Sequence, residues 1–206
     1  MKIEIMNLSY SYDGKKNVLE NVNLCFEGGA CYILTGKNGV GKTTLSKLIM
    51  RLLKPVKRTV FIDGADVCSL RTGKIAQRIG YVFQDANLQF FSNTVEEELS
   101  FPYKLTKKYD EVAQWKINGA LEEFGLSGLA GRHPLTLSSG EKQRLALAAA
   151  MLSEPEFLIL DEPAASVDRD GREFIANRIK EFVGKGGGAL VISHDETFFE
   201  GVKIEI

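Results

Sequence analysis

Apolar and polar residues alternate along some short stretches of the chain and recur at helical spacing along others. Alternation at every second position, or a short apolar run, predicts a strand, whereas apolar residues three and four positions apart predict a helix. The predicted strands cover residues 3–8, 18–26, 30–35, 59–62, 79–83, 157–160 and 189–192. Helical patterns cover residues 42–53, 94–124, 140–152 and 168–182.

The order of these elements indicates the fold class. Strands and helices take turns around residues 30–53 and through the last third of the chain, which favours an α/β fold with a mostly parallel sheet and crossover helices. The β-rich first 30 residues and the helical stretch 94–124 are expected to be additions to this core. The charged run Glu96–Glu98 in that stretch is typical of a solvated helix face.

Composition and charge exclude several classes of protein. The 206 residues include 26 Lys and Arg against 27 Asp and Glu, a formal net charge of −1, which gives no broad attraction to nucleic acid or to an anionic membrane. The longest clearly apolar run, Leu145–Leu152, is far shorter than the roughly 20 residues that cross a bilayer. The alternating residues 1–5 are not typical of a signal peptide. We therefore expect a cytoplasmic location and no nucleic acid partner.

One segment has the pattern of a phosphate-binding loop. Gly36–Thr43 satisfies G-x-x-x-x-G-K-[ST] and lies between a predicted strand and a predicted helix, the context in which this motif cradles nucleotide phosphates. Its glycines let backbone N–H groups turn toward phosphate oxygens, Lys42 reaches the β- and γ-phosphates, and Thr43 offers its hydroxyl to Mg²⁺. The predicted nucleotide-binding residues here are Gly36, Lys37, Asn38, Gly39, Val40, Gly41, Lys42, Thr43 and Thr44.

Two carboxylates follow the apolar strand 157–160. Asp161 and Glu162 lie where a P-loop ATPase has a second contact to Mg²⁺ and a residue that activates water. We expect Asp161 to hold the metal through water and Glu162 to act as general base, a role usually worth about 10²–10⁴-fold in rate. Without a phosphate loop in the same chain, such a pair after a strand is a common solvated turn.

The segment Leu137–Arg144 precedes an Ala- and Leu-rich helix and reads as a helix N-terminus capped by Ser138 or Ser139. It also resembles the signature motif of ATP-binding-cassette (ABC) ATPases, usually Leu-Ser-Gly-Gly-Gln. Other residues resemble further motifs of this family. Gln84 matches the Q-loop, Ala165-Ser166-Val167-Asp168 matches the D-loop, and His194 matches the switch histidine. Tyr12, with Tyr10 as its alternative, matches the aromatic residue that stacks on adenine.

The resemblance spans residues 10–195 and implies one ABC-type ATP-binding domain over 1–206. The P-loop NTPase core and the antiparallel β subdomain would take residues 1–83 and 155–206, and the helical subdomain residues 84–154. In this family two cassettes pack head to tail and enclose two ATP molecules. Each ATP, with its Mg²⁺, lies between the phosphate loop of one subunit and the signature helix of the other.

The resemblance also implies roles for single residues. Outside the phosphate loop, the implied nucleotide contacts are Tyr12, Ser138, Ser139, Gly140, Glu141 and Asp168. The implied catalytic residues are Glu162, His194 and Gln84, and the implied metal ligands are Thr43, Gln84 and Asp161. Two positions depart from the family pattern, because Ser139 stands where glycine is usual and Glu141 where glutamine is usual. A homodimer and a heterodimer both remain open.

The residues after Gln84 resemble one particular group within the ABC family. The stretches 84–91 and 94–99 are similar to the pattern found in energy-coupling factor importers of cobalt, nickel and vitamins. This implies an ATP-hydrolysing subunit on the cytoplasmic face of the membrane that powers solute transport through separate transmembrane subunits. Phe90 and Phe91 would either line a groove for a helix of such a subunit or be core residues.

Three other functions remain as alternatives. A soluble mechanical ABC ATPase acting on nucleic acid or ribosomes is one, although the chain has no room for the long coiled coil or second cassette of such relatives. An ABC exporter ATPase is another. A P-loop kinase for a small molecule would leave the signature segment and His194 without a role.

Overall fold

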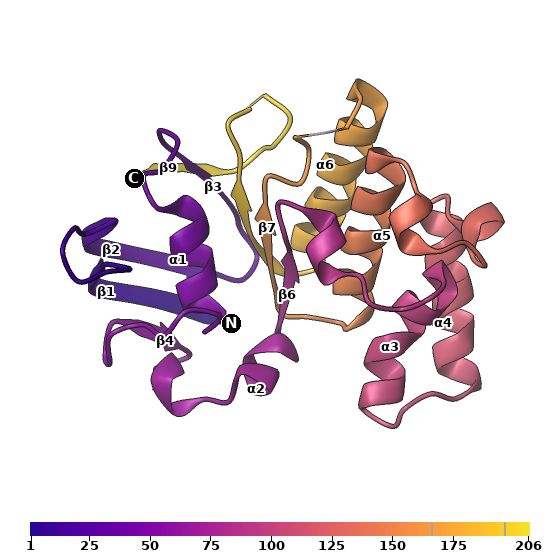
Figure 1. The fold of residues 1–206 in the computed structure, drawn as a ribbon, viewed down its shortest axis with the longest axis horizontal. Helices are drawn as coiled ribbons and strands as arrows, with labels where there is room; N and C mark the ends of the chain where they lie inside the picture. The colour runs from indigo at the N-terminus through magenta and orange to yellow at the C-terminus, as the bar shows by residue number, and fades with distance from the viewer. Residues whose placement is uncertain (166, 196) are drawn as a thin grey trace.

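Two sheets form the framework of the computed structural model, which describes residues 1–165, 167–195 and 197–206 (Figure 1). An antiparallel sheet has the order β2-β1-β4-β5, and a parallel sheet has the order β6-β7-β8-β3-β9. The strands are β1 (Lys2–Tyr10), β2 (Leu19–Glu27), β3 (Cys31–Thr35), β4 (Val60–Ile62), β5 (Ala65–Asp66), β6 (Ile79–Val82), β7 (Phe157–Asp161), β8 (Gly188–Ile192) and β9 (Val202–Glu205). The predicted α/β class is confirmed.

The helices connect and cover these sheets. They are α1 (Lys42–Ile49), α2 (Thr72–Ala76), α3 (Val95–Leu105), α4 (Glu111–Glu123), α5 (Ser139–Leu152) and α6 (Arg169–Gly184), with short 3₁₀ helices η1 (Val67–Ser69), η2 (Ala86–Gln89), η3 (Ser127–Leu129) and η4 (Pro134–Thr136). Among the described residues, no helix combines the length and the apolar character needed to cross a bilayer.

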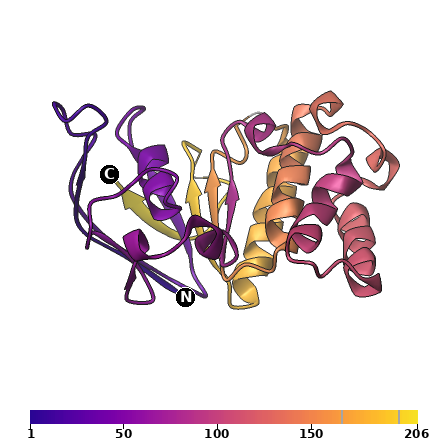
Figure 2. The same ribbon diagram turned by 60° about the horizontal axis from the view of Figure 1, so that its bottom comes forward.

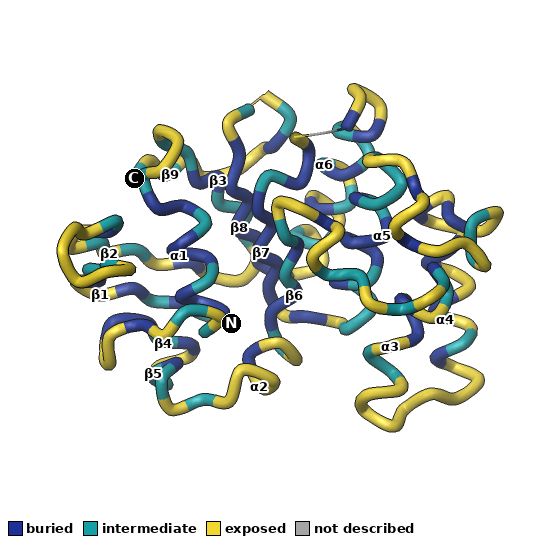
Figure 3. Tube along the Cα trace, viewed as in Figure 1, coloured by how far each residue is buried: buried dark blue, intermediate teal, exposed yellow. Residues whose placement is uncertain are grey.

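Both faces of the parallel sheet are buried, because successive residues of a strand point to opposite sides. On one face Ile159 and Leu190 pack with Leu45 of α1 and with residues of the antiparallel sheet, so α1 lies between the two sheets (Figure 2). On the other face Leu158 and Val191 pack with residues of α5 and α6. The central strands are accordingly buried along their whole length (Figure 3).

The helical lobe is divided more finely than the sequence pattern indicated. The pattern over 94–124 forms two helices, because the chain reverses at Lys107, which has a left-handed φ of +56°. Thr94 accepts a hydrogen bond from the N–H of Glu97 at the start of α3, and Asp110 accepts one from Ala113 at the start of α4. Each helix therefore has its own N-cap. The proposed boundaries of the lobe, 84 and 154, stay a prediction.

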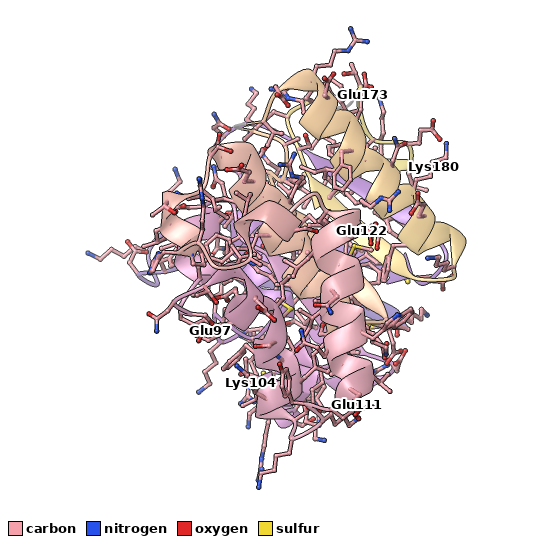
Figure 4. The ribbon with its side chains drawn as sticks, turned by 90° about the vertical axis from the view of Figure 1, so that its right-hand side faces the viewer. Glu97, Lys104, Glu111, Glu122, Glu173 and Lys180 are labelled. Atoms are coloured by element: carbon pink, nitrogen blue, oxygen red, sulfur yellow. The ribbon has the colours of Figure 1, made fainter. Side chains whose placement is uncertain are left out.

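Charged residues of the helical lobe and of α6 largely face solvent. Figure 4 shows such side chains along the outer faces of α3, α4 and α6, namely Glu97, Lys104, Glu111, Glu122, Glu173 and Lys180. Glu98 is an exception, and the prediction that it lies on a solvated helix face is wrong. It is buried, and its Oε2 accepts hydrogen bonds from the N–H groups of Phe91 and Ser92 at 3.1 and 2.9 Å.

Apart from the 3₁₀ helices, three short elements among the described residues have no counterpart in the predictions, namely β5, α2 and β9. The predicted helix 42–53 also ends early, at Ile49, because Arg51 takes a left-handed φ of +55° and Leu52 donates to the carbonyl of Lys47.

The carboxyl ends of the parallel strands lie at one edge of their sheet. The loops that follow β3, β6, β7 and β8 therefore meet there, and these segments hold the phosphate loop, Gln84, Glu162 and His194.

Candidate functional site

The phosphate-binding loop connects β3 to α1 in a conformation that only glycine adopts easily. Gly36, Gly39 and Gly41 have φ of +141°, +80° and +110°, the region that disfavours side chains. A Cβ at Gly36 would collide with the carbonyl oxygen of Ile206, and a Cβ at Gly41 would lie 2.6 Å from Leu19 Cδ2. The loop consequently passes tightly between neighbouring segments and delivers its N–H groups to the start of α1.

Lys42 is the charged group of this loop. The residue is buried, and its Nζ donates to the carbonyl oxygens of Gly36 and Lys37 at 2.8 and 3.2 Å. The ammonium group is thereby held on the inner side of the loop. The predicted loop residues Lys37, Asn38 and Gly39 are exposed.

Tyr12 lies next to the phosphate loop. Its Oη is 2.9 Å from Oγ1 of Thr44, a buried residue of α1, while the tyrosine itself is 60% exposed. Tyr10 touches the Tyr12 ring edge-on but is partly buried against the core. Of the two candidates for stacking on adenine, Tyr12 presents the more accessible ring beside the loop. The assignment of the stacking role itself stays a prediction.

A cleft of about 390 Å³ contains all three predicted metal ligands, Thr43, Gln84 and Asp161. Asp161 is 1% exposed, and its Oδ1 is buried without a hydrogen-bond partner. Burial raises the pKa of this carboxyl group, although the Thr43 hydroxyl and the nearby ammonium of Lys47 oppose that shift. Burying an oxygen without a hydrogen bond costs free energy unless a bound group compensates for the lost hydration.

This donor set fits Mg²⁺. The ion prefers oxygen ligands and is usually held by one or two carboxylates together with substrate phosphates and water. The cleft offers a carboxylate, a hydroxyl and an amide oxygen on three different segments. The unpaired Oδ1 of Asp161 is the observation that a bound cation would explain.

Glu162 and His194 meet at the tips of β7 and β8. His194 Nε2 lies 3.1 Å from Glu162 Oε1, an ion-pair distance, but the approach lacks the alignment of a hydrogen bond and leaves Oε1 without a hydrogen-bond partner. The N–H of Glu162 donates to the carbonyl of Ile192 at 2.9 Å. Burial raises the pKa of Glu162, and the nearby His194 partly offsets this. The pair combines a carboxylate of increased basicity with a half-exposed imidazole.

The signature segment lies apart from the phosphate loop of its own chain, since α5 and α1 cover opposite faces of the parallel sheet (Figures 1 and 2). Ser138 is the N-cap of α5, and Glu141 completes a capping box. Glu141 Oε2 accepts hydrogen bonds from the N–H and the hydroxyl of Ser138 at 2.7 and 2.8 Å. These bonds lower the pKa of Glu141. Ser139 is the first residue of α5, and Gly140 follows it.

The segment after Glu162 leads into α6. Asp168 is the N-cap of this helix, and its Oδ1 accepts a hydrogen bond from the N–H of Gly171 at 2.9 Å. Val167 is buried. Ser166, part of the predicted D-loop, lies outside the described residues. The structure therefore shows a structural role for Asp168 within its own chain.

Some residues at or near the site were not predicted from the sequence. Lys47 and Leu88 also line the cleft, and Glu98 holds the loop at Phe91. Lys47 follows the phosphate loop by one helical turn, so its position on α1 could have indicated that it faces the same side. Leu88 and Glu98 depend on how the chain folds back after β6.

Comparisons with known proteins agree with these observations. The sequence profile of the family described as ABC transporter matches residues 19–165. A putative ABC transporter ATP-binding protein of Pyrococcus furiosus is 38% identical over 194 residues, which cover 94% of this chain and 74% of the relative. An energy-coupling factor transporter ATP-binding protein of Thermotoga maritima is 37% identical over 202 residues, covering 97% of this chain and 75% of the relative.

A similar solved structure adds the quaternary context. It is the dimeric structure of a post-hydrolysis state of an ATP-binding cassette bound to ADP and Pi, with a TM-score of 0.85 and 27% identity. The similarity covers 99% of this chain and 94% of the other. The match thus includes the phosphate loop, the helical lobe and the elements between them.

Proposed function

The chain belongs to the family of ABC transporter ATP-binding proteins, and we propose that it binds and hydrolyses ATP to drive a solute through separate transmembrane subunits. An importer of the energy-coupling factor type fits best, with the chain on the cytoplasmic face of the membrane. One observation carries this proposal. The segment after β6 lines the metal cleft with Gln84 and Leu88 and then presents an exposed aromatic side chain, Phe91.

Nucleotide binding is assigned to the loop around Lys42. The N–H groups of the loop and the ammonium of Lys42 would hold the phosphates, and the Tyr12 ring would stack on the adenine. Thr43, Gln84 and Asp161 would hold Mg²⁺, whose bound form neutralises charge on the phosphates.

Hydrolysis is assigned to Glu162 and His194. Glu162 accepts a proton from the attacking water, a task for which its raised pKa suits it because a stronger base takes the proton more readily. His194, 3.1 Å from Glu162, would contact the γ-phosphate. Gln84 connects this site to the segment that carries Phe91.

A second cassette would complete each site. α5 is remote from the phosphate loop of its own chain, so Ser138, Ser139 and Gly140 at its amino terminus would serve a nucleotide on another subunit. The dimeric cassette structure, which resembles this chain, supports such an arrangement. Asp168 would lie at the same interface and couple the two sites.

The capping box gives a first test of this arrangement. In the free chain the Glu141 carboxylate occupies the donors of Ser138 and places a negative charge at the helix end that would face ATP. Glu141→Gln keeps one acceptor for the Ser138 N–H and removes the charge. We expect ATP-induced dimerisation, measured by light scattering in the Glu162→Gln background, to tighten by about threefold to tenfold, equivalent to about 1 kcal/mol.

Glu141→Ala is the matched control, because it removes both the charge and the acceptor. It should lower the free energy of unfolding by about 1 kcal/mol, because the cap of α5 is lost. If Glu141→Gln weakened ATP-induced dimerisation, the signature helix would need its carboxylate, and the assigned role of this charge would be wrong.

Three exposed apolar residues, Leu88, Phe91 and Phe101, would contact the transmembrane partner, and we call them the docking surface. Leu88 and Phe91 are 74% and 61% exposed, and the rings of Phe91 and Phe101 meet edge-on at 4.3 Å between centroids. Phe90, in contrast, is partly buried against the core. Of the two aromatic residues considered for a groove, only Phe91 is thus strongly exposed. The buried Glu98 carboxylate holds the backbone of Phe91 in place.

Phe91→Asp should disrupt binding to the transmembrane partner. Loss of a buried phenyl group costs about 1.5–3 kcal/mol, and a charge in the interface adds to this. We expect the tagged variant to recover at least about tenfold less integral membrane protein from detergent-solubilised native membranes than the wild-type chain, as measured by quantitative mass spectrometry. ATP binding should be unchanged.

The control for this experiment is Val56→Asp. Val56 is 56% exposed and lies between α1 and β4, so the variant places the same charge on the other lobe. Equal recovery with both variants and the wild-type chain would contradict the docking surface. Recovery of ribosomes or nucleic acid without any membrane protein would instead favour a soluble mechanical ATPase.

A further inference from the structure

Arg172 connects two loops that flank the candidate catalytic carboxylate. Its Nε donates to the carbonyl oxygen of Val167 at 2.9 Å, in the loop that follows β7. Its Nη1 donates to Asp195 Oδ2 at 3.1 Å, in the loop that follows β8. The guanidinium group also lies 5.5 Å from the centroid of the Phe198 ring. With 30% of its side chain exposed, Arg172 is a partly buried bridge between two chain segments.

Asp195 is held from several sides. Its Oδ1 accepts hydrogen bonds from the N–H and the hydroxyl of Thr197 at 3.1 and 2.6 Å. Its N–H donates to Ser193 Oγ at 3.1 Å, and the Ser193 hydroxyl donates to the Asp195 carbonyl at 3.0 Å. The N–H of Ser193 donates to Leu34 in β3. The backbone is therefore fixed on both sides of the residue between them, His194.

Among the described residues, the His194 ring has no hydrogen-bond partner. Its side chain is 49% exposed, and its approach to Glu162 at 3.1 Å is not a hydrogen bond. The position of the imidazole therefore depends on the loop backbone, which the Ser193–Asp195 hydrogen bonds fix. Arg172 connects this loop to the loop after β7 through the Asp195 side chain. A guanidinium is well suited to this task, because its rigid fork of donors can bind two acceptors at once.

We propose that Arg172 is a positioning residue for His194. By holding the loop after β8 against the loop after β7, it keeps the imidazole beside Glu162, where hydrolysis needs it. The proposal rests on ATP hydrolysis at this site as proposed above. It assigns a function to a side chain that touches neither the nucleotide loop nor the metal cleft.

A merely structural role would have different consequences. Arg172 could simply stabilise α6, as a surface ion pair does. The same helix offers a matched control in Arg169, whose Nε lies 3.0 Å from Glu173 Oε1 with the Arg169 side chain 82% exposed. Glu173 stands on the outer face of α6 (Figure 4). Among the described residues, this pair joins one turn of the helix to the next and forms no hydrogen bond to the loops after β7 and β8.

The experiment compares Arg172→Met with Arg169→Met, each in the wild-type and the His194→Ala background. ATP turnover and KM for ATP are measured on the full chain in the assembly that hydrolyses ATP, with thermal denaturation as the check of folding. We expect Arg172→Met to lower kcat about tenfold, because small displacements of catalytic groups cost rate, with KM changed less than twofold. In the His194→Ala background it should have no further effect. Arg169→Met should match its parent in both backgrounds.

A conservative variant keeps the test informative if Arg172→Met folds poorly. Arg172→Lys can reach one of the two loops but not both, so its kcat should lie between those of the wild-type chain and Arg172→Met. Asp195→Asn should lower kcat without adding to the effect of Arg172→Met.

Three results would overturn the proposal. They are an unchanged kcat in Arg172→Met, an equal loss in Arg169→Met, and a loss in Arg172→Met that multiplies fully onto that of His194→Ala. Any of these with an active wild-type chain would leave the proposed ATPase function intact. A wild-type chain that never hydrolyses ATP in a purified complex would contradict the proposed function, and the positioning role with it.

Discussion

Glu162→Gln should reduce ATP hydrolysis by about 10²–10⁴-fold, the usual contribution of a general base, while ATP binding is retained. Glutamine has nearly the same shape but cannot accept a proton from water. It should also tolerate the left-handed φ of +51° at this position as well as glutamate does. Phosphate release under single-turnover conditions measures the rate, and equilibrium binding of a fluorescent ATP analogue measures the affinity.

The same variant should also trap ATP between two cassettes, because the nucleotide that would hold them together is no longer consumed. Size-exclusion chromatography with ATP would show a dimer that the wild-type chain forms only transiently. Glu111→Gln, an exposed glutamate at the start of α4, controls for the loss of a carboxylate elsewhere. Turnover by Glu162→Gln at the wild-type rate would show that the base is another group.

Lys42→Ala should abolish nucleotide binding at physiological concentrations. Lys42 Nζ is held by two carbonyl oxygens of the loop, and its ammonium would bind the β- and γ-phosphates through charge-assisted hydrogen bonds. Two such bonds are worth at least about 3 kcal/mol, or roughly a hundredfold in Kd. Isothermal titration with Mg²⁺-ATP measures this directly.

Lys57→Ala is the control for loss of a positive charge, since Lys57 is exposed and lies in the connection between α1 and β4. It should bind ATP as the wild-type chain does. If Lys42→Ala bound ATP within threefold of the wild-type affinity, the phosphate loop would not be the nucleotide site.

The parts of the site that could be predicted are those whose geometry is local. The phosphate loop follows from glycines at fixed spacing, and the positive φ at Gly36 and Gly41 is what that spacing provides. Asp161 and Glu162 follow from an apolar strand that ends in carboxylates. The capping of α5 by Ser138 was one of two options, and the structure selects it over Ser139.

The parts that could not be predicted depend on segments far apart in the chain. β9 exists because Val202–Glu205 pairs with β3, and a short alternating segment alone cannot indicate such a partner. Glu98 belongs to a charged run, yet it is buried because two N–H groups of the loop at Phe91 need an acceptor. Arg172 matches no motif, and its importance emerges only when the loops after β7 and β8 are seen together.

The most direct test of the central claim is the rate of ATP hydrolysis by the complex purified from detergent-solubilised native membranes through the tagged wild-type chain or through Glu162→Gln. Both preparations are expected to contain the same integral membrane protein in near-stoichiometric amount. The wild-type complex should hydrolyse ATP in a Mg²⁺-dependent manner, and the variant complex should do so at least about a hundredfold more slowly. Equal rates, or a preparation without any membrane protein, would contradict the central claim.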